Sequence, residues 1–417
     1  MQPLKVLVVT LRYPPYVAGG YELLTRDAVE ALRERGHEVH VLAGRGARFA
    51  DQPDTHALLE PGLDEGDDLF ALSHQGSNLD RLRLHVYSGA NRRATRRALE
   101  ESGAEVLFYF NLGLVSLAPL VAARLRGVPT LGFASDPWPA NHWLRDWRED
   151  PRQRTKRLRL WLLERFWGGF RSLVGLGRLF TCSSFLRDHL LESGVDASTT
   201  EVLHLGVPPD VTRAARNTPS PERAGDEPLR VLCLSSFWKG KGQDVLLEAV
   251  ATARRGGAPI ELVLAGSGGG AFREELEARA RRDDLAGGVR FEEGLDRAGV
   301  SALLARSHVL ALPSTWGEPF PLATLEGMAH GLAVTVSDAG GSAEAVEEGV
   351  TGFVTPAGDA PALAQSLLAL EADEGLRRRV AAAGREHAET TLSHARFVDA
   401  LETALFEATG RGRERSA

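Results

Sequence analysis

The sequence predicts an α/β protein made of two doubly wound domains, each with a parallel sheet covered by helices. Short, continuously apolar runs such as Leu4 to Thr10 and Leu229 to Leu234 are typical of strands that are buried on both faces of a parallel sheet. A helical pattern follows each run, over residues 21–35 and 242–255. With 417 residues, the chain is too long for one ordinary core and about right for two domains.

The remaining strands are also expected as short apolar runs. In the first half they are predicted at 38–43, 105–110, 129–134, 179–182 and 201–204, and in the second half at 260–265, 289–291, 309–312, 333–336 and 352–354. In sheets of this kind, ligands bind outside the carboxyl ends of the strands. We also expect binding between the two domains, which is a common place for small-molecule sites.

A proline-rich segment divides the chain. Residues 208–228 hold five prolines among many polar residues, which is typical of a linker between domains. We therefore expect an N-terminal domain over residues 1–208, a linker over 209–228 and a C-terminal domain over 229–393. An amphipathic helix over 394–410 is expected to pack back toward the N-terminal domain.

Composition restricts the classes of function. The net charge of −7, from 49 basic and 56 acidic residues, disfavours a general nucleic-acid binder, whose phosphate contacts need a net basic surface. Cys182 and Cys233 lie in apolar, strand-like surroundings, and the sequence shows no metal-ligand spacing. The first residues run directly into a strand without a signal peptide, and no apolar run reaches the roughly 18 residues of a membrane span. These features favour a cytoplasmic protein.

The strongest motif lies in the segment 313–331 (PSTWGEPFPLATLEGMAHG). Pro321 is well placed to start a helix at Leu322, and the free N–H groups and positive dipole of such a helix form a seat for a diphosphate. Glu318 lies just before this helix end and Glu326 one turn inside it. One carboxylate can therefore accept hydroxyl hydrogen bonds on each side of a bound pyrophosphate. Capping of the helix by both glutamates is the alternative, and the spacing alone leaves it open.

Two glycine-bearing loops precede this motif. In the segment 231–249 (VLCLSSFWKGKGQDVLLEA) a strand ends, a polar loop follows and a helix begins, so Lys241 can direct a point charge toward a phosphate. Lys239 and Lys241 are two of only four lysines in the chain. A solvated loop lysine is the simpler interpretation. The loop at 264–270 (LAGSGGG) also follows a strand, but glycine at that place is common in α/β proteins.

Taken in order, these segments resemble the family-4 glycosyltransferases, which have the GT-B fold of two Rossmann-like domains facing an interdomain cleft. The resemblance extends over nearly the whole chain. Its further elements are the Gly19-Gly20 loop followed by Glu22, the segment TCSSFLRDHL near Ser183, Gly206-Val207, Lys241-Gly242, Gly266, the run from Phe291 to Gly294, and SDAGGSAEAVEEGVTGFVTPAGD at 337–359.

The resemblance implies a hexosyltransferase-type enzyme that uses a UDP- or GDP-sugar, with the acceptor bound by the N-terminal domain and the donor by the C-terminal domain. Glu326 would bind the ribose, Glu318 the sugar hydroxyls and Lys241 the diphosphate, and the Gly19-Gly20 backbone would approach a phosphate closely. The implied donor-binding residues are Gly19, Gly20, Ser236, Lys239, Lys241, Gly266, Arg290, Phe291, Glu318, Phe320, Pro321, Leu322, Ala323 and Glu326, and the catalytic candidates are Glu318, Lys241 and Asp136. Neither a metal nor a cofactor is expected.

The resemblance also implies retention of the anomeric configuration without a divalent metal. Lys241 and the helix N-terminus would stabilise the leaving diphosphate. The leaving phosphate would itself take the proton of the acceptor on the same face of the sugar. The acceptor could be a sugar, a lipid-linked sugar or a small molecule.

Three positions depart from the family pattern. Ser236 stands where the family usually has arginine, and Ser135-Asp136 where it often has His-Asp. Pro321 stands where the family usually has glycine. Lys239 could substitute for the arginine, and Asp136 remains a candidate contact to the acceptor or the sugar. A catalytically inactive, nucleotide-binding homologue is the alternative that these departures leave open.

An NAD-dependent oxidoreductase is the competing class of enzyme. It needs G-x-G-x-x-G directly after the first strand, and the first loop, TLRYPPYVAGG, lacks that spacing.

Residues 136–178 mix tryptophans with arginines and are favoured as an insert on the acceptor side. The part from 151 to 178 could touch anionic lipid or pack on the domain. His37 is expected to make a turn contact, and His204 has no partner spacing and is expected to be structural.

Overall fold

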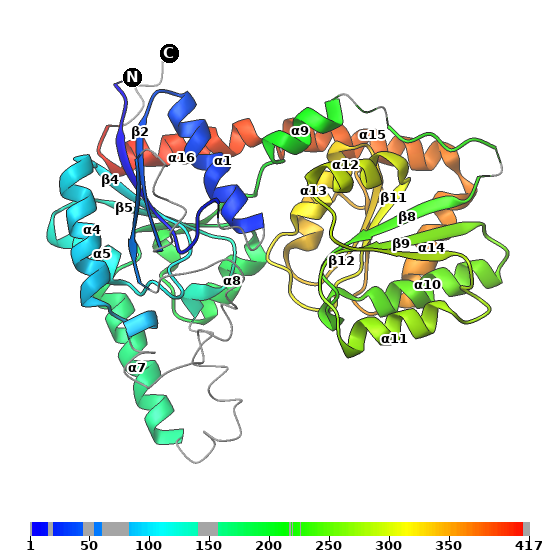
Figure 1. The fold of residues 1–417 in the computed structure, drawn as a ribbon, viewed down its shortest axis with the longest axis horizontal. Coiled ribbons are helices and arrows are strands. Elements are labelled where there is room, and N and C mark those ends of the chain that lie inside the picture. The colour runs from blue at the N-terminus through cyan, green and yellow to red at the C-terminus, as the bar shows by residue number, and fades with distance from the viewer. Residues whose placement is uncertain are drawn as a thin grey trace. The chain divides into compact units, whose positions relative to one another are not determined.

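The computed structural model describes residues 2–15, 20–44, 54–60, 83–140, 157–216, 218, 220–225 and 227–411. The chain divides into two compact units. Unit 1 comprises Met1–Leu203 and Val398–Ala417, and unit 2 comprises His204–Phe397. Each unit contains one parallel sheet with helices packed against it (Figure 1). This is the α/β architecture with two parallel sheets that the sequence predicts.

The sheet of unit 1 has seven parallel strands in the order β3-β2-β1-β4-β5-β6-β7. The strands are β1 (Lys5–Val9), β2 (Glu38–Gly44), β3 (Thr55–Leu59), β4 (Val106–Tyr109), β5 (Thr130–Ala134), β6 (Arg178–Thr181) and β7 (Thr200–Val202). The residues at positions 6–9 of β1 are all fully buried, because a central parallel strand is covered on both faces. This burial explains the continuous apolar run at the start of the sequence.

The helices of unit 1 begin and end at local sequence signals. They are α1 (Gly20–Glu34), α4 (Gly89–Ser102), α5 (Ala118–Leu125), α7 (Arg157–Val174), α8 (Ser184–Glu192), the short η2 (Trp138–Ala140) and η4 (Ala197–Thr199), and α16 (His394–Ala408) from Val398 onward. Ser88 caps α4, because its Oγ accepts a hydrogen bond from the N–H of Asn91 at 3.2 Å. Gly103 ends that helix in the left-handed region, with φ of 61°.

His37 connects the start of β2 to α16. Its Nδ1 accepts a hydrogen bond from the N–H of Leu4 at 3.0 Å, so Nε2 carries the proton and donates to Glu402 of α16 at 3.0 Å. Arg35 donates to the other carboxylate oxygen of Glu402 at 2.9 Å. The sequence predicts a turn contact for His37, and the structure shows that this turn is held by a carboxylate far along the chain.

The sheet of unit 2 has six parallel strands in the order β10-β9-β8-β11-β12-β13. The strands are β8 (Leu229–Leu234), β9 (Ile260–Ala265), β10 (Val289–Glu292), β11 (Val309–Leu312), β12 (Ala333–Ser337) and β13 (Phe353–Thr355). The helices are α9 (Pro209–Arg216), η5 (Lys239–Lys241), α10 (Gln243–Arg255), α11 (Ala271–Ala280), α12 (Arg297–Arg306), α13 (Leu322–Ala329), η6 (Gly341–Ala345), α14 (Ala360–Ala372) and α15 (Glu374–Thr390). Within unit 2, α10 and α11 lie along one face of the sheet, and α12 and α13 along the other (Figure 1).

Each sheet reverses its strand order at one place. In unit 2, the chain moves outward from β8 through β9 to β10, and then returns to β11 on the other side of β8. In unit 1, the corresponding reversal lies between β1 and β4. The loops that leave the two strands at such a point diverge, so a crevice opens outside the carboxyl ends of the strands. A ligand site in unit 2 is therefore expected at the loops after β8 and β11.

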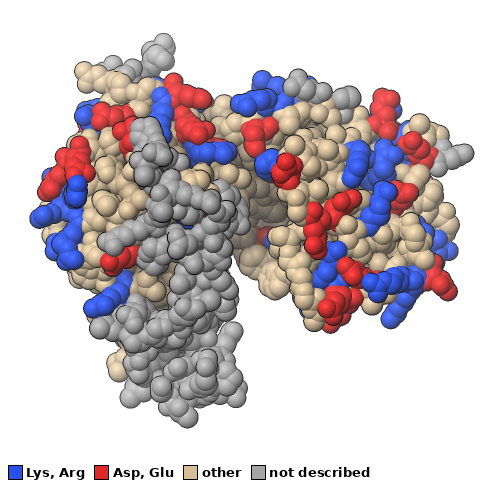
Figure 2. All heavy atoms as spheres, in the orientation of Figure 1, with Lys and Arg blue, Asp and Glu red and all other residues tan. Residues whose placement is uncertain are grey.

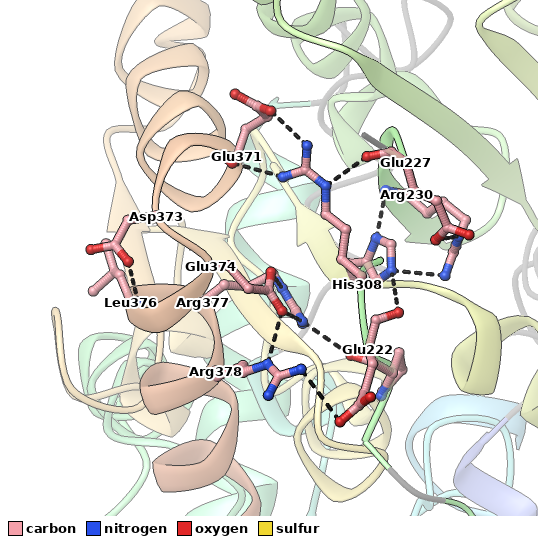
Figure 3. Close-up of polar contacts among 12 residues, drawn as sticks. Glu222, Glu227, Arg230, His308, Glu371, Asp373, Glu374, Leu376, Arg377 and Arg378 are labelled. Carbon is pink, nitrogen blue, oxygen red and sulfur yellow. Dashed lines mark hydrogen bonds and ion pairs between the residues drawn. The ribbon is translucent and has the colours of Figure 1, made fainter. Parts of the chain in front are cut away.

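The segment predicted as a linker forms part of unit 2. Its first residues fold as α9, and two arginines attach the described residues 220–225 to α14 and α15 (Figure 3). Arg377 of α15 is 1% exposed and donates to the main-chain oxygen of Pro221 at 3.0 Å. Arg223 donates to the main-chain oxygen of Glu371 in α14 at 2.7 Å. These contacts hold Pro221 and Arg223 against helices of unit 2.

Charged side chains of both signs are interspersed over the visible face of unit 2 (Figure 2). Many of them form ion pairs across neighbouring elements. Arg279 of α11, for example, binds Glu248 of α10 at 2.6 Å and Asp284 at 2.9 Å. Within the part of the chain that the structure describes, no helix combines the length and apolar character that crossing a membrane requires.

Candidate active site

Lys241 and Glu318 meet at the reversal point of the unit 2 sheet. Lys241 ends η5, which follows β8, and Glu318 lies in the loop that follows β11. The Lys241 ammonium contacts Glu318 Oε1, and Ser314 Oγ donates to the same oxygen at 2.8 Å. The Glu318 side chain is 8% exposed and that of Lys241 is 20% exposed, so the pair is largely shielded from water. The predicted phosphate-binding lysine and the predicted sugar-binding carboxylate are thus brought together.

A glycine makes this approach possible. Gly242 has φ of 69°, a conformation that L side chains rarely adopt. A Cβ at this position would lie 1.9 Å from the main-chain oxygen of Pro313. The loop after β8 therefore passes directly over the end of β11, and this contact sets where Lys241 can reach.

The N-terminus of α13 is not capped by either glutamate of the motif. Its N-cap residue is Pro321, which makes no side-chain cap hydrogen bond. The carboxylate of Glu318 binds Lys241, and that of Glu326 binds Arg297. Leu322 and Ala323, which the sequence predicts to contact the donor, form the first turn of α13, where the backbone N–H groups have no partner inside the helix. The capping alternative therefore does not describe the glutamates in this structure.

The glycine pair at 340–341 supports the loop that carries Glu318. The N–H of Gly341 donates to the main-chain oxygen of Glu318 at 2.6 Å. Gly340 has φ of 76°, and a Cβ there would lie 2.5 Å from the same oxygen. This explains why two glycines follow β12: the backbone of the motif loop lies against theirs.

His204 has a partner that its sequence position does not indicate. Its Nε2 lies 3.1 Å from Glu344 Oε2 in η6. Its ring stacks on that of Phe320, with centroids 5.2 Å apart and an interplanar angle of 13°. No local spacing indicates this partner, because it lies 140 residues away in the sequence. Phe320, a predicted donor contact, is buried beneath this histidine.

Glu326 is held by an arginine that the sequence interpretation missed. Arg297 Nη1 donates to Glu326 Oε1 at 2.8 Å, and Arg297 also grips Asp210 of α9 through Nε at 2.9 Å and Nη2 at 3.0 Å. Glu326 is 6% exposed. Burial raises the pKa of its carboxyl group, and the charge and hydrogen bond of Arg297 lower that pKa. No local spacing signals this arginine, since it is 29 residues away from Glu326 on another helix.

Some of the other predicted residues of unit 2 lie at the loop that follows β8, and one does not. Gly266 lies against the exit of β8, because a Cβ there would be 1.9 Å from the main-chain oxygen of Ser235. Ser236 and Lys239 are exposed on the same exit loop. Arg290 points elsewhere: it pairs with Glu261 at 3.3 Å, near the amino end of β9. Its guanidinium is therefore not brought to the site.

Phe291 takes part in an aromatic sandwich. The guanidinium of Arg273 lies 4.2 Å from the ring centroid of Phe237 and 4.3 Å from that of Phe291. Stacking of this kind fixes both rings at the ends of β8 and β10. The sequence predicts that Phe291 contacts the donor. The structure places Phe291 in β10, beside Phe237 of the loop that follows β8.

Unit 1 has its own polar cluster after β4 and β5. Asp136 accepts hydrogen bonds from Asn111 Nδ2 at 2.6 Å and from the N–H of Trp138 at 2.8 Å. Burial raises the pKa of Asp136, and these hydrogen bonds lower it. The N–H of Asn111 also contacts the hydroxyl of Tyr21, which follows Gly20 at the start of α1. Gly19 lies outside the described residues.

Metal ligands are not grouped in the described ranges: no three His, Cys, Asp or Glu side chains there could hold an ion together. The site in unit 2 instead combines one lysine, two carboxylates with cationic partners and the open end of a helix. Such a set can bind an anion and several hydroxyl groups at once.

Comparison with known proteins gives matches along most of the chain. Residues 18–211 match the family model for Glycosyltransferase Family 4, and residues 216–387 match that for Glycosyl transferases group 1. A phosphatidyl-myo-inositol mannosyltransferase of Mycobacterium tuberculosis is 27% identical over 88% of this chain and 88% of that protein. A glycogen synthase of the same species is 25% identical over 92% of this chain and 90% of that protein.

Solved structures share the fold. The glycosyltransferase from Rickettsia africae superposes with a TM-score of 0.70 at 17% identity, covering 97% of this chain and 98% of that one. Anabaena HepE in complex with UDP-glucose superposes with a TM-score of 0.66 at 19% identity, covering 97% of this chain and 100% of that one. At these identities the similarity concerns the arrangement of helices and strands.

Proposed function

Because this chain belongs to the glycosyltransferase families that both models describe, we propose that it transfers a sugar from a UDP- or GDP-sugar to a hydroxyl acceptor. We propose further that the anomeric configuration is retained and that no divalent metal takes part. The observation that carries the proposal is the Lys241–Glu318 pair beside the uncapped N-terminus of α13, at the reversal point of the sheet. HepE, a relative in fold, binds UDP-glucose, which supports a nucleotide sugar as the donor.

Each part of the site suits one part of the donor. The diphosphate lies at the first turn of α13, where free N–H groups and the helix dipole favour an anion. Lys241 neutralises it as a point charge. Glu318 accepts hydrogen bonds from the sugar hydroxyls, and Glu326 accepts them from the ribose. Lys241 also contacts Glu318, so in the proposed complex the lysine is shared between a carboxylate and a phosphate.

The chemistry needs stabilisation of a leaving group. The bond between the anomeric carbon and the diphosphate oxygen breaks, and the electron pair stays on the diphosphate. Lys241 and the N–H groups of α13 stabilise that developing charge. The acceptor oxygen attacks from the same face, and its proton passes to the leaving phosphate oxygen. Asp136 in unit 1 is the proposed contact to the acceptor or to the sugar.

A donor screen tests the proposal. Purified protein is mixed with UDP- and GDP-sugars and a panel of acceptors, with and without a chelator, and free nucleotide is measured. We expect release with one donor, unchanged by chelation, and NMR should show the same anomeric configuration in donor and product. An inverted product would refute retention, and loss of activity on chelation would refute the metal-independent mechanism. No release and no nucleotide binding by calorimetry would favour an inactive homologue.

We propose in addition that the α7 surface contacts anionic lipid and that the protein acts in the cytoplasm at the membrane face. Large apolar side chains on α7 are exposed to solvent: Trp161 by 51%, Leu162 by 53%, Phe166 by 57% and Leu173 by 72%. The sequence from 152 to 159 adds five basic residues and no acidic one. A helix with exposed apolar side chains and a run of basic residues at the start of its sequence has the composition that binds an anionic membrane surface.

Liposome sedimentation separates this surface from a purely structural helix. Wild type should pellet with vesicles that contain phosphatidylglycerol and not with phosphatidylcholine alone. The double variant Phe166→Ser/Leu173→Ser should lose the pelleting while keeping its circular dichroism spectrum. Equal pelleting of wild type with both lipids, or none with either, would refute the anionic membrane contact.

A further inference from the structure

We infer that Arg297, held by Asp210, is a positioning residue that keeps the Glu326 carboxylate oriented for the ribose of the donor. This rests on the proposed function, because it assigns a support to one of the groups proposed to bind the nucleotide. Neither Arg297 nor Asp210 belongs to the motifs that the sequence analysis identifies. Asp210, Arg297 and Glu326 all belong to unit 2.

The three side chains come from three helices. Glu326 lies in the second turn of α13, Arg297 begins α12 and Asp210 lies in the first turn of α9. Arg297 binds both oxygens of Asp210, at 2.9 and 3.0 Å, in the fork-like geometry that fixes the plane of a guanidinium. Its remaining terminal nitrogen donates to Glu326 Oε1 at 2.8 Å. Asp210 therefore determines where Arg297 points, and Arg297 determines how the Glu326 carboxylate is turned.

The contact leaves half of the carboxylate available. Arg297 binds Oε1, and among the residues that the structure describes no hydrogen bond reaches Oε2. A carboxyl group can accept hydrogen bonds from hydroxyls through both of its oxygens only when it is ionised. Burial favours the protonated form, so a buried carboxylate needs a compensating cation. Arg297 supplies that cation without occupying the second oxygen.

Other charged groups near α13 do not replace Arg297. Asp210 is negative and raises the pKa of Glu326. His330, at the end of the same helix, has its pKa lowered by burial and is held between the main-chain oxygen of Glu326 at 2.9 Å and Ser301 Oγ at 3.1 Å. Arg385 acts on His330 and is not among the groups that influence Glu326. Arg297 is therefore the cation that acts on this carboxylate in the described structure.

Substitution at position 297 is tolerable for the fold. Asp210, Arg297 and Glu326 line an open groove of about 480 Å³ between α9, α12 and α13. The Arg297 side chain is 44% exposed. Truncation to alanine therefore widens a groove that water already enters and leaves no sealed cavity.

A competing role for Arg297, in which it blocks Glu326, predicts the opposite change in nucleotide affinity. If Arg297 merely occupies Glu326 until the nucleotide displaces it, removing Arg297 strengthens nucleotide binding. If Arg297 positions and ionises Glu326, removing it weakens binding, and the loss grows as the pH falls because Glu326 then takes up a proton more readily. The sign of the change thus distinguishes the two roles.

Calorimetric titration of the full chain with UDP and with GDP between pH 8 and pH 6 tests the inference. We expect Arg297→Ala to weaken binding by about tenfold at pH 7, the loss of one charge-assisted hydrogen bond, and the ratio to wild type to grow toward pH 6. Arg297→Lys should restore part of the affinity, and Asp210→Asn should give a smaller loss. Arg279→Ala is the matched control, because Arg279 also bridges two carboxylates, Glu248 and Asp284; it should bind like wild type.

A double-mutant cycle distinguishes the loss of the Arg297–Glu326 contact from a folding defect. In a Glu326→Gln background, whose amide cannot ionise, Arg297→Ala should cause no further pH-dependent loss. Tighter binding by Arg297→Ala, or a constant ratio to wild type across the pH range, would overturn the inference while leaving the proposed function intact. Wild type that binds neither UDP nor GDP would overturn the proposed donor site and this inference together.

Discussion

Replacing His308 with asparagine perturbs a buried histidine that ties the start of β11 to β8 and to the proline-rich segment (Figure 3). His308 is 0% exposed. Its Nδ1 accepts a hydrogen bond from the N–H of Arg230 at 3.0 Å, and its Nε2 lies 2.7 Å from Arg230 Nη2 and 3.3 Å from the main-chain oxygen of Glu222. Burial lowers the pKa of His308 to about 4, and the charges of Arg230 and Arg377 contribute to this shift.

The pH dependence follows from this pKa. The ordinary value is 6.5, so below pH 6.5 the unfolded chain takes up a proton that the folded unit excludes until about pH 4. Stability is therefore complete above pH 6.5 and is lost as the pH falls from 6.5 toward 4. Between pH 7.5 and pH 5 the share of His308 in the free energy of unfolding is roughly 2 kcal/mol, obtained from the two pKa values and about 1.4 kcal/mol per pH unit.

Urea unfolding followed by circular dichroism at pH 7.5 and pH 5 measures this share. We expect His308→Asn to lower stability at pH 7.5, because its amide only partly reproduces the polar contacts of the ring, and to reduce the loss between the two pH values by roughly 2 kcal/mol. If His308→Asn loses as much stability as wild type between pH 7.5 and pH 5, the assignment of a neutral buried histidine is refuted.

Three further predictions concern the donor site. Glu326→Ala should weaken nucleotide binding, whereas Glu318→Ala should mainly lower turnover; equal donor affinity and equal rates in both variants and wild type would contradict the assignment. Lys241→Ala should reduce binding and kcat together, measured by calorimetry and steady-state kinetics, because its charge acts on the ground state and on the transition state. Gly242→Ala should lower the thermal midpoint and the nucleotide affinity, because its Cβ would collide with the main-chain oxygen of Pro313 and alanine at φ of 69° costs about 1 kcal/mol or more. A Gly242→Ala variant with a wild-type melting temperature would contradict the close crossing of the two loops.

Much of the fold follows from local patterns. The central strands were predictable within one or two residues, because continuous apolar runs mark strands buried on both faces. β3 was missed: it is an edge strand in which only Leu59 is buried, and its apolar run is short, from Ala57 to Leu59. α9 was missed for another reason, because Pro209 was interpreted as part of a linker although proline is also favoured at the first position of a helix.

The sequence by itself determined the two parallel sheets and the loop that carries Glu318 to the start of α13. Apolar periodicity, glycine and proline fix such features over a few residues, so they can be found without knowing what lies across the fold. Only the tertiary structure decided the partners: Lys241 for Glu318, 77 residues apart, and Arg297 for Glu326, 29 residues apart. Strand order brings these groups together, and strand order depends on long-range pairing that no local pattern encodes. The same long-range packing buries Glu326 and so creates the need for the arginine beside it.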